Sequence, residues 1–200
     1  MTRIIAGSAG GRRLAVPPGR STRPTSDRAR EGLFATTLAI RGTLAGAAVI
    51  DLYAGSGAVG LEALSRGATD VLLVESDAGA VRVIRENIAA VGLPGARVVA
   101  GRVERALGRG IGDQRPRDFV FADPPYAAPD DELERLLLAL PRGNWLAPAA
   151  LVCVERATRS GPLPWPPGYI PDRCRSYGEA TLWYGLAAGA ERAPSSPAGG

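Results

Sequence analysis

The segment with the most distinctive chemistry is Asp123-Pro124-Pro125-Tyr126, which directly follows a short apolar run. Two consecutive prolines fix φ and remove two N–H donors, so the backbone polar groups left on them are acceptors. The Asp123 carboxylate and the Pro124 carbonyl could each accept one N–H of an exocyclic amine on a nucleobase. The amine nitrogen could then direct its lone pair at a methyl donor, a step that needs positioning more than a strong base. Tyr126 would stack on the extracted base, so we predict that these four residues are catalytic.

A glycine-rich loop is predicted upstream, between an apolar run and a helix. Gly55, Gly57 and Gly60 match the spacing G-x-G-x-x-G. Glycines at these positions let the backbone turn sharply and approach a cofactor, and the helix N-terminus that follows supplies N–H groups. The strand before the loop and the helix after it favour a nucleotide-like cofactor over a plain tight turn.

Two acidic residues at predicted strand ends distinguish between cofactors. At Asp51 a carboxylate would accept hydrogen bonds from a cationic aminoacyl group, directly or through water, and would repel the pyrophosphate of a dinucleotide. Glu75 can accept both hydroxyls of a ribose, which fits either NAD or S-adenosylmethionine (SAM). Asp51 therefore favours SAM. The alternative for each acid is a solvated charge at a strand end.

The elements that must position these residues alternate between strand and helix. This alternation predicts a parallel, doubly wound α/β sheet. Two later strands, at 173–177 and 180–186, are expected to form an antiparallel hairpin through Gly178 and Glu179. The parallel strands are predicted at 48–52, 70–75, 96–100, 118–123 and 150–155, and the helices near 61–64, 81–91, 103–109 and 130–140.

Residues 1–41 form a basic extension before this pattern. We predict strands at 3–6 and 12–16, then a proline-rich strap, then a helix from Ser26 or Asp27 to about Ile40. The extension holds eight arginines and two acids, a charge of +6, whereas the rest of the chain carries −2 because the total is +4. Such a distribution favours an arm that contacts phosphate, with a merely solvated face as the alternative.

The composition excludes several classes of site. The 200 residues contain no histidine and two cysteines, so a Cys/His metal site, a disulfide framework and Ser/His/Asp catalysis are not expected. No apolar run reaches the ~20 residues that cross a bilayer, and no signal peptide is seen, so a cytoplasmic protein without a membrane partner is expected. We also expect a monomer. We expect a catalytic domain at 42–187 and a disordered tail at 188–200.

The sequence resembles the RsmD-type 16S ribosomal RNA guanine-N2 methyltransferases over roughly residues 1–186. The resemblance implies a Rossmann-like, seven-stranded SAM-dependent methyltransferase fold with a substrate-facing N-terminal extension. It also implies methylation of the N2 amino group of one guanine in 16S rRNA, within an assembling 30S particle. The segments that carry it are RIIAGSAGGRRLAVP, RPTSDRAREGLF at 23–34, DLYAGSGAVGLEALSRGA at 51–68, VESD at 74–77, ADPPY at 122–126 and YGEATL at 177–182.

The resemblance also assigns residues to the site. Many methyltransferases place an acid or amide where this chain has Arg102, so we expect adenine to contact the backbone of Val103 instead. The signature near cofactor and substrate contains Arg23, Pro24, Thr25, Asp27 and Arg28. The predicted cofactor-binding residues are Asp51, Tyr53, Ala54, Gly55, Ser56, Gly57, Glu75, Ser76, Arg102, Val103 and Asp123, and the predicted substrate-binding residues are Arg12, Arg13, Arg20, Arg23, Thr25, Arg28 and Tyr126.

Three other functions stay open at this point. A DNA amino-methyltransferase could use the same four catalytic residues on adenine or cytosine, although the chain leaves little room for a separate recognition domain. A non-catalytic RNA-binding module could keep the fold and the basic extension. A nicotinamide oxidoreductase could use the glycine loop, but Asp51 and Asp123–Tyr126 argue against it.

Overall fold

A computed structural model of the chain describes residues 2–17, 27–125 and 128–188. Arg20, Arg23, Thr25 and Tyr126, all predicted to belong to the site, lie outside these residues, as does nearly all of the predicted tail. Within them, no group of His, Cys, Asp and Glu side chains could hold a metal ion. None of the described helices combines the length and the apolar character that a membrane span requires.

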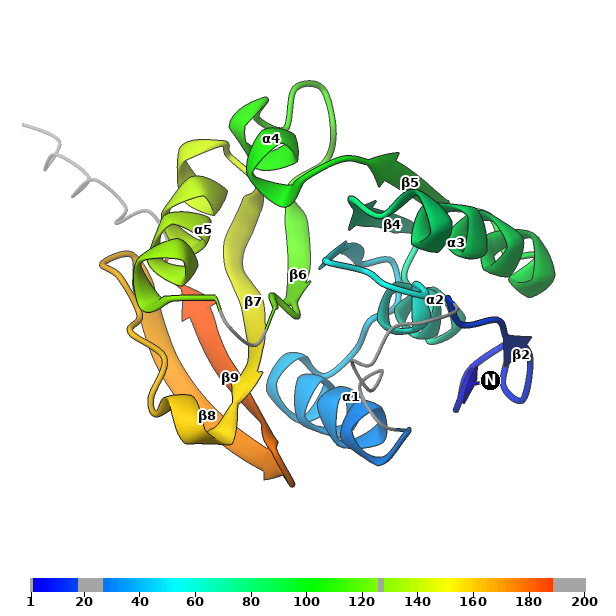
Figure 1. The fold of residues 1–200 in the computed structure, drawn as a ribbon, viewed down its shortest axis with the longest axis horizontal. Helices are drawn as coiled ribbons and strands as arrows, with labels where there is room; N and C mark the ends of the chain where they lie inside the picture. Colours follow the sequence, from blue (N-terminus) through cyan, green and yellow to red (C-terminus); the bar gives the residue numbers. More distant parts are fainter. Residues whose placement is uncertain (1, 18–26, 126–127, 189–200) are drawn as a thin grey trace, which may run out of the picture.

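The described strands form a seven-stranded sheet in the order β5-β4-β3-β6-β7-β9-β8 (Figure 1). The first five strands in this order are parallel, and β9 is antiparallel to both of its neighbours. The predicted mixed, mostly parallel sheet is therefore confirmed. The strands are β3 (Ala48–Leu52), β4 (Asp70–Glu75), β5 (Ala96–Ala100), β6 (Arg117–Ala122), β7 (Leu146–Ala157), β8 (Tyr169–Tyr177) and β9 (Ala180–Ala187).

Helices cover both faces of the sheet (Figure 1). Leu33 and Phe34 of one helix, Leu61 of the next and Ile84 of a third pack on one face with alternate strand residues such as Phe121. A second apolar cluster fills the opposite face. Central parallel strands buried on both faces read as continuous apolar runs, which is why AVIDL and DVLLVE were recognisable as strands. The helices are α1 (Asp27–Arg41), α2 (Ala58–Ser65) and α3 (Ala78–Val91) on the first face, and α4 (Val103–Gly108) and α5 (Asp130–Arg142) on the second.

The N-terminal hairpin is much shorter than predicted. Its strands β1 (Thr2–Arg3) and β2 (Arg13–Leu14) have two residues each, so the predicted strands at 3–6 and 12–16 are wrong in extent. The reason is that the neighbouring backbone groups bond to side chains of the body instead. Ile5 and Ala6 donate to the carboxylate of Glu62.

The C-terminal strands are longer than predicted. β7 begins at Leu146 rather than near 150, and β8 begins at Tyr169 rather than 173. The start of β8 was not predicted because the sequence there is rich in proline, which is unusual within strands. Pro171 is tolerated because β8 is an edge strand and its register with β9 shifts at this point. The predicted hairpin through Gly178 and Glu179 is confirmed by the pairing of Tyr177 with Ala180.

Candidate active site

A cavity of about 1560 Å³ opens at the carboxyl ends of β3, β4 and β6. These ends lie where the strand order departs from the chain order, with β3 between β4 and β6, which is the usual ligand site of an open α/β sheet. The cavity brings together most of the predicted site residues. Its lining includes Asp51, Tyr53, Ala54, Gly55, Ser56, Glu75, Ser76, Arg102, Val103, Asp123, Pro124 and Pro125.

Asp51 is buried at the end of the strand before the glycine loop, with 2% of its surface exposed. One carboxylate oxygen, Oδ2, accepts a hydrogen bond of 2.8 Å from the Gly60 N–H. The pKa of Asp51 is raised to about 7, mainly by burial; the Gly60 hydrogen bond opposes the rise, and the charge of Glu75 adds to it. The alternative of a solvated strand-end charge is therefore wrong for Asp51.

Glu75 is equally buried and holds the loop against β4. Its Oε2 atom accepts from the Gly55 N–H at 2.8 Å. Its Oε1 atom accepts from the N–H groups of Ser76 and Asp77, each at 2.8 Å. Glu75 is also not a solvated charge, and it has a structural role that the sequence did not reveal. Its predicted contact with a ribose stays a prediction.

The loop between β3 and α2 requires unusual backbone conformations. Tyr53 has a φ of 63°, in the left-handed region that non-glycine residues rarely adopt. Gly57 has a φ of 78°, and a Cβ there would lie 2.9 Å from Cδ2 of Leu73. Glycine is therefore needed at this position both for its backbone freedom and for close packing on the sheet. The Tyr53 hydroxyl donates to Oε1 of Glu104 at 3.5 Å, so this ring is held beside the start of α4.

The predicted catalytic segment begins directly after β6. Asp123 is partly buried, and its N–H donates to the Leu52 carbonyl at 3.3 Å. Pro124 is buried, whereas Pro125 is exposed, and the Pro125 carbonyl accepts from the Ala128 N–H at 2.8 Å. Asp123 and both prolines line the same cavity as Asp51, and their catalytic role stays a prediction.

The N-terminal extension contacts the cavity at several points. Thr2, Val16, Pro17 and Arg30 belong to its lining. The guanidinium of Arg30 is buried and donates to the Thr2 hydroxyl at 3.2 Å, to the Arg3 carbonyl at 2.5 Å and to Asp27 at 3.0 Å. The extension is therefore fixed to the start of α1 beside the cavity.

Three side chains that sequence reasoning missed anchor this extension. Glu62 on α2 is fully buried and accepts from Ile5 at 2.6 Å, from Ala6 at 2.9 Å and from Arg66 at 2.8 Å. Ser65 bonds the backbone of Ala6 and Ala9. Asn87 on α3 bonds both backbone groups of Ala15 and donates to the Ser56 carbonyl. The only signal in the sequence is the presence of polar residues on otherwise apolar helix faces.

The predicted substrate-binding arginines differ in their surroundings. Arg12 donates to the carbonyls of Ala90, at 2.8 Å, and of Val91, so its guanidinium satisfies carbonyls at the C-terminal end of α3. Arg13 and Arg28 are exposed. Substrate binding by all three stays a prediction, and Arg12 gains a structural role that the sequence did not indicate. Arg102 is exposed at the start of α4, next to the buried Val103.

Comparison with known sequences decides the family. A sequence model of the family described as conserved hypothetical protein 95 matches residues 2–185, nearly the whole chain. The chain belongs to this family. Together with the named relatives described next, this membership confirms the resemblance to RsmD-type enzymes and the prediction of a methyltransferase.

Two relatives of this chain carry the name of a ribosomal RNA methyltransferase. The chain is 38% identical over 159 residues to Ribosomal RNA small subunit methyltransferase D of Escherichia coli. The aligned residues make up 80% of this chain and 76% of the relative. It is 33% identical over 154 residues to the protein of the same name from Haemophilus influenzae, over 76% of this chain and 77% of that one.

Solved structures confirm the fold of this family member. The structure of yhhF from Escherichia coli matches with a TM-score of 0.82 and 35% identity, over 94% of this chain and 99% of that chain. The predicted Rossmann-like methyltransferase fold is therefore confirmed.

Proposed function

We propose that this protein transfers a methyl group from SAM to the N2 amino group of one guanine in 16S rRNA, within an assembling 30S particle in the cytoplasm. The observation that carries the proposal is the shared cavity of Asp51, Glu75, Asp123 and Pro124. In this cavity Asp51 and Glu75, which could bind the cationic nucleoside SAM, lie beside Asp123 and Pro124, which could accept hydrogen bonds from an amine.

The cavity residues fit SAM. Asp51 is a buried carboxylate that a nearby cation would stabilise in its charged form. Glu75 lies at the end of the next strand, where an acid commonly binds the hydroxyls of a ribose. The apolar side chains of Val74 and Val103 line the same cavity and suit a planar base. When bound, SAM supplies a methyl group on a positively charged sulfur.

The catalytic segment would position the guanine amino group that receives the methyl group. The carboxylate of Asp123 and the carbonyl of Pro124 each accept one N–H of the guanine N2 amino group, which draws its lone pair out of conjugation with the ring. The amine becomes more acidic as it gains the methyl group, so Asp123 needs only modest basicity to take the departing proton. Because residues 124 and 125 are both prolines, the backbone that carries these hydrogen-bond acceptors is rigid. Tyr126, by this proposal, stacks on the base.

The basic extension supports a nucleic acid as the substrate. Among the described arginines of the extension, Arg3, Arg13 and Arg28 are exposed. The extension is fixed beside the cavity through Arg30, Glu62 and Asn87. Both named relatives are ribosomal RNA small subunit methyltransferases, which favours ribosomal RNA over DNA. The chain is proposed to act as a monomer.

The proposal is tested by methyl transfer from labelled SAM to two substrates, undermethylated 30S particles and duplex DNA. Transfer to the particles alone is expected, and transfer to DNA alone would overturn the proposal. The variant Asp123→Ala should lose transfer by roughly 100-fold or more even when SAM is saturating. Unchanged transfer by this variant would refute the role of Asp123, and the exposed Asp113→Asn serves as the control.

A further inference from the structure

One buried carboxylate next to the catalytic segment has no part in the proposed reaction. Glu155, on β7, has 3% of its surface exposed. β6 and β7 run parallel, and Ala122 pairs with Val154. The residues that follow this pair are Asp123 and Glu155. Because neighbouring strands lie about 4.8 Å apart, the two acids occupy adjacent positions at the same edge of the sheet.

Glu155 lies on the α1–α3 face of the sheet. Phe121 and Cys153 pack together in the apolar cluster of this face. Side chains alternate along a strand, so Glu155, two residues after Cys153, lies on the same face. Burial raises the pKa of the Cys153 thiol, and the charge of Glu155 adds to the rise, as expected of close neighbours.

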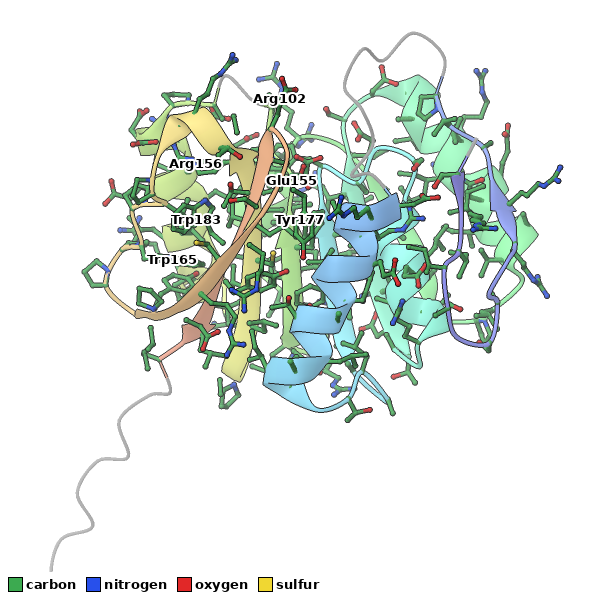
Figure 2. All side chains as sticks on the ribbon, turned by 90° about the horizontal axis from the view of Figure 1, so that it is seen from below. Arg102, Glu155, Arg156, Trp165, Tyr177 and Trp183 are labelled. Carbon is green, nitrogen blue, oxygen red and sulfur yellow. The ribbon has the colours of Figure 1, made fainter. Side chains whose placement is uncertain are left out.

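The surroundings of Glu155 connect it to the active site. Phe121 and Asp123 line the cofactor cavity. Glu155 lies outside the lining of that cavity and borders a small neighbouring hollow, which it shares with Pro124 and Pro125 and with Leu133 of α5. Figure 2 shows Glu155 toward one end of the sheet. Arg102, which lines the cofactor cavity, is seen at the same end. A base whose amine is held by Asp123 and Pro124 would thus have a second carboxylate on the β7 side.

Guanine presents a matching pattern of hydrogen-bonding groups. Its N2 amino group is adjacent to the N1–H, so both positions donate. In adenine and cytosine the ring nitrogen beside the amino group is an acceptor. A carboxylate accepts hydrogen bonds but donates none when ionised, so it attracts the N1–H and repels a ring nitrogen with a lone pair. Two adjacent carboxylates therefore fit guanine and reject the other two amines.

We propose that Glu155 accepts the N1–H of the target guanine and thereby selects guanine over adenine and cytosine. The inference rests on the proposed function and deepens it, since it names the group that reads the base. Glu155 contacts the base but takes no part in the transfer of the methyl group. It determines specificity.

The test compares guanine with 2-aminopurine at the target nucleotide. 2-Aminopurine keeps the 2-amino group but has an acceptor at N1. Once mass spectrometry has located the target, 16S rRNA carrying either base there is made by ligation and assembled into 30S particles. We measure kcat/KM for both particles with the wild-type protein, with Glu155→Gln, and with the exposed control Glu134→Gln. The glutamine amide can donate to the N1 acceptor.

The ratio of kcat/KM for guanine to that for 2-aminopurine should fall roughly tenfold or more in Glu155→Gln and stay unchanged in Glu134→Gln. A merely structural role would lower both rates together, so an unchanged ratio overturns the inference even where the variant is less stable. Absence of transfer to the guanine particle by the wild-type protein would instead contradict the proposed function. The two failures are therefore distinguishable.

Discussion

Asn87 of α3 donates a hydrogen bond of 2.9 Å to the carbonyl oxygen of Ser56 in the glycine loop. The same side chain bonds the N–H of Ala15, at 2.8 Å, and its carbonyl, at 3.0 Å. One buried amide thus connects the N-terminal extension to the loop predicted to bind the cofactor. The position of the extension and the shape of the cofactor site are therefore coupled.

Replacement of Asn87 by alanine should loosen both segments. It leaves the backbone groups of Ala15 and Ser56 without their partner, so the free energy of unfolding is expected to fall by about 1–3 kcal/mol in urea titrations. The affinity for SAM, measured by calorimetry, should fall as well. The exposed Glu86→Ala on the same helix is the control. If SAM affinity and stability in the Asn87 variant both matched those of the control, the coupling would be wrong.

Glu62 should be the main anchor of the hairpin. The variant Glu62→Gln keeps the shape but removes the charge that faces Arg66 at 2.8 Å and Arg30 at 4.0 Å. Removing one partner of a buried pair leaves uncompensated charge, so a loss of several kcal/mol in unfolding free energy is expected. Limited proteolysis should also cut residues 2–17 faster than in the exposed control Glu31→Gln. Equal cleavage rates would show that other contacts hold the hairpin.

The affinity for SAM should depend on pH through Asp51. Since its pKa is raised to about 7, the carboxyl binds a proton as the pH falls through 7, whereas a cationic ligand needs the ionised form. Affinity is expected to be highest above pH 7 and to weaken below it, with proton release on binding detected by calorimetry in two buffers. Asp51→Asn keeps an acceptor for the Gly60 N–H but should bind weakly and without this pH dependence. A wild-type affinity that is constant from pH 5.5 to 8 would contradict the assignment.

The same shift gives the pH dependence of stability a definite sign. The folded-state pKa of Asp51 lies above its ordinary value of 3.8. Between about pH 4 and 7 the folded protein therefore holds a proton that the unfolded chain has released. The contribution of Asp51 to the unfolding free energy falls as the pH rises through this window. Asp51→Asn should remove that slope in urea titrations.

Binding of the basic extension to RNA is tested best by replacing arginines other than Arg12. Because Arg12 bonds carbonyls at the end of α3, its replacement would also disturb folding. The exposed pair Arg13→Ala and Arg28→Ala should weaken particle binding and make the slope of log affinity against log salt shallower by roughly 1 to 2. SAM affinity should be unchanged. Particle affinity insensitive to both changes would mean that these arginines form only a solvated face.

The elements that sequence predicted well are those with strong local signals. The strands at 48–52, 70–75 and 96–100 are confirmed with the bounds predicted, and α1 begins at Asp27. The cavity also gathers Asp51, Glu75 and Asp123, because parallel strands end at one edge. These results depend on apolar runs and on positions at strand ends, both of which are local properties.

What sequence could not predict depends on contacts between distant segments. The hairpin is short because Glu62, more than 50 residues away, takes the N–H groups of Ile5 and Ala6. Arg12 resembles any exposed cation in the sequence, and only the packing of β2 near α3 shows its carbonyl partners. Glu155 resembles a strand-end acid until the pairing of β6 with β7 places it beside Asp123.

The central claim is tested most directly by mapping methylated nucleotides in 16S rRNA by mass spectrometry, in cells with and without the gene. We predict one N2-methylguanosine that is absent from the deletion strain, restored by the wild-type gene and not restored by Asp123→Ala. A 16S rRNA with the same methylated nucleotides in both strains would contradict the account.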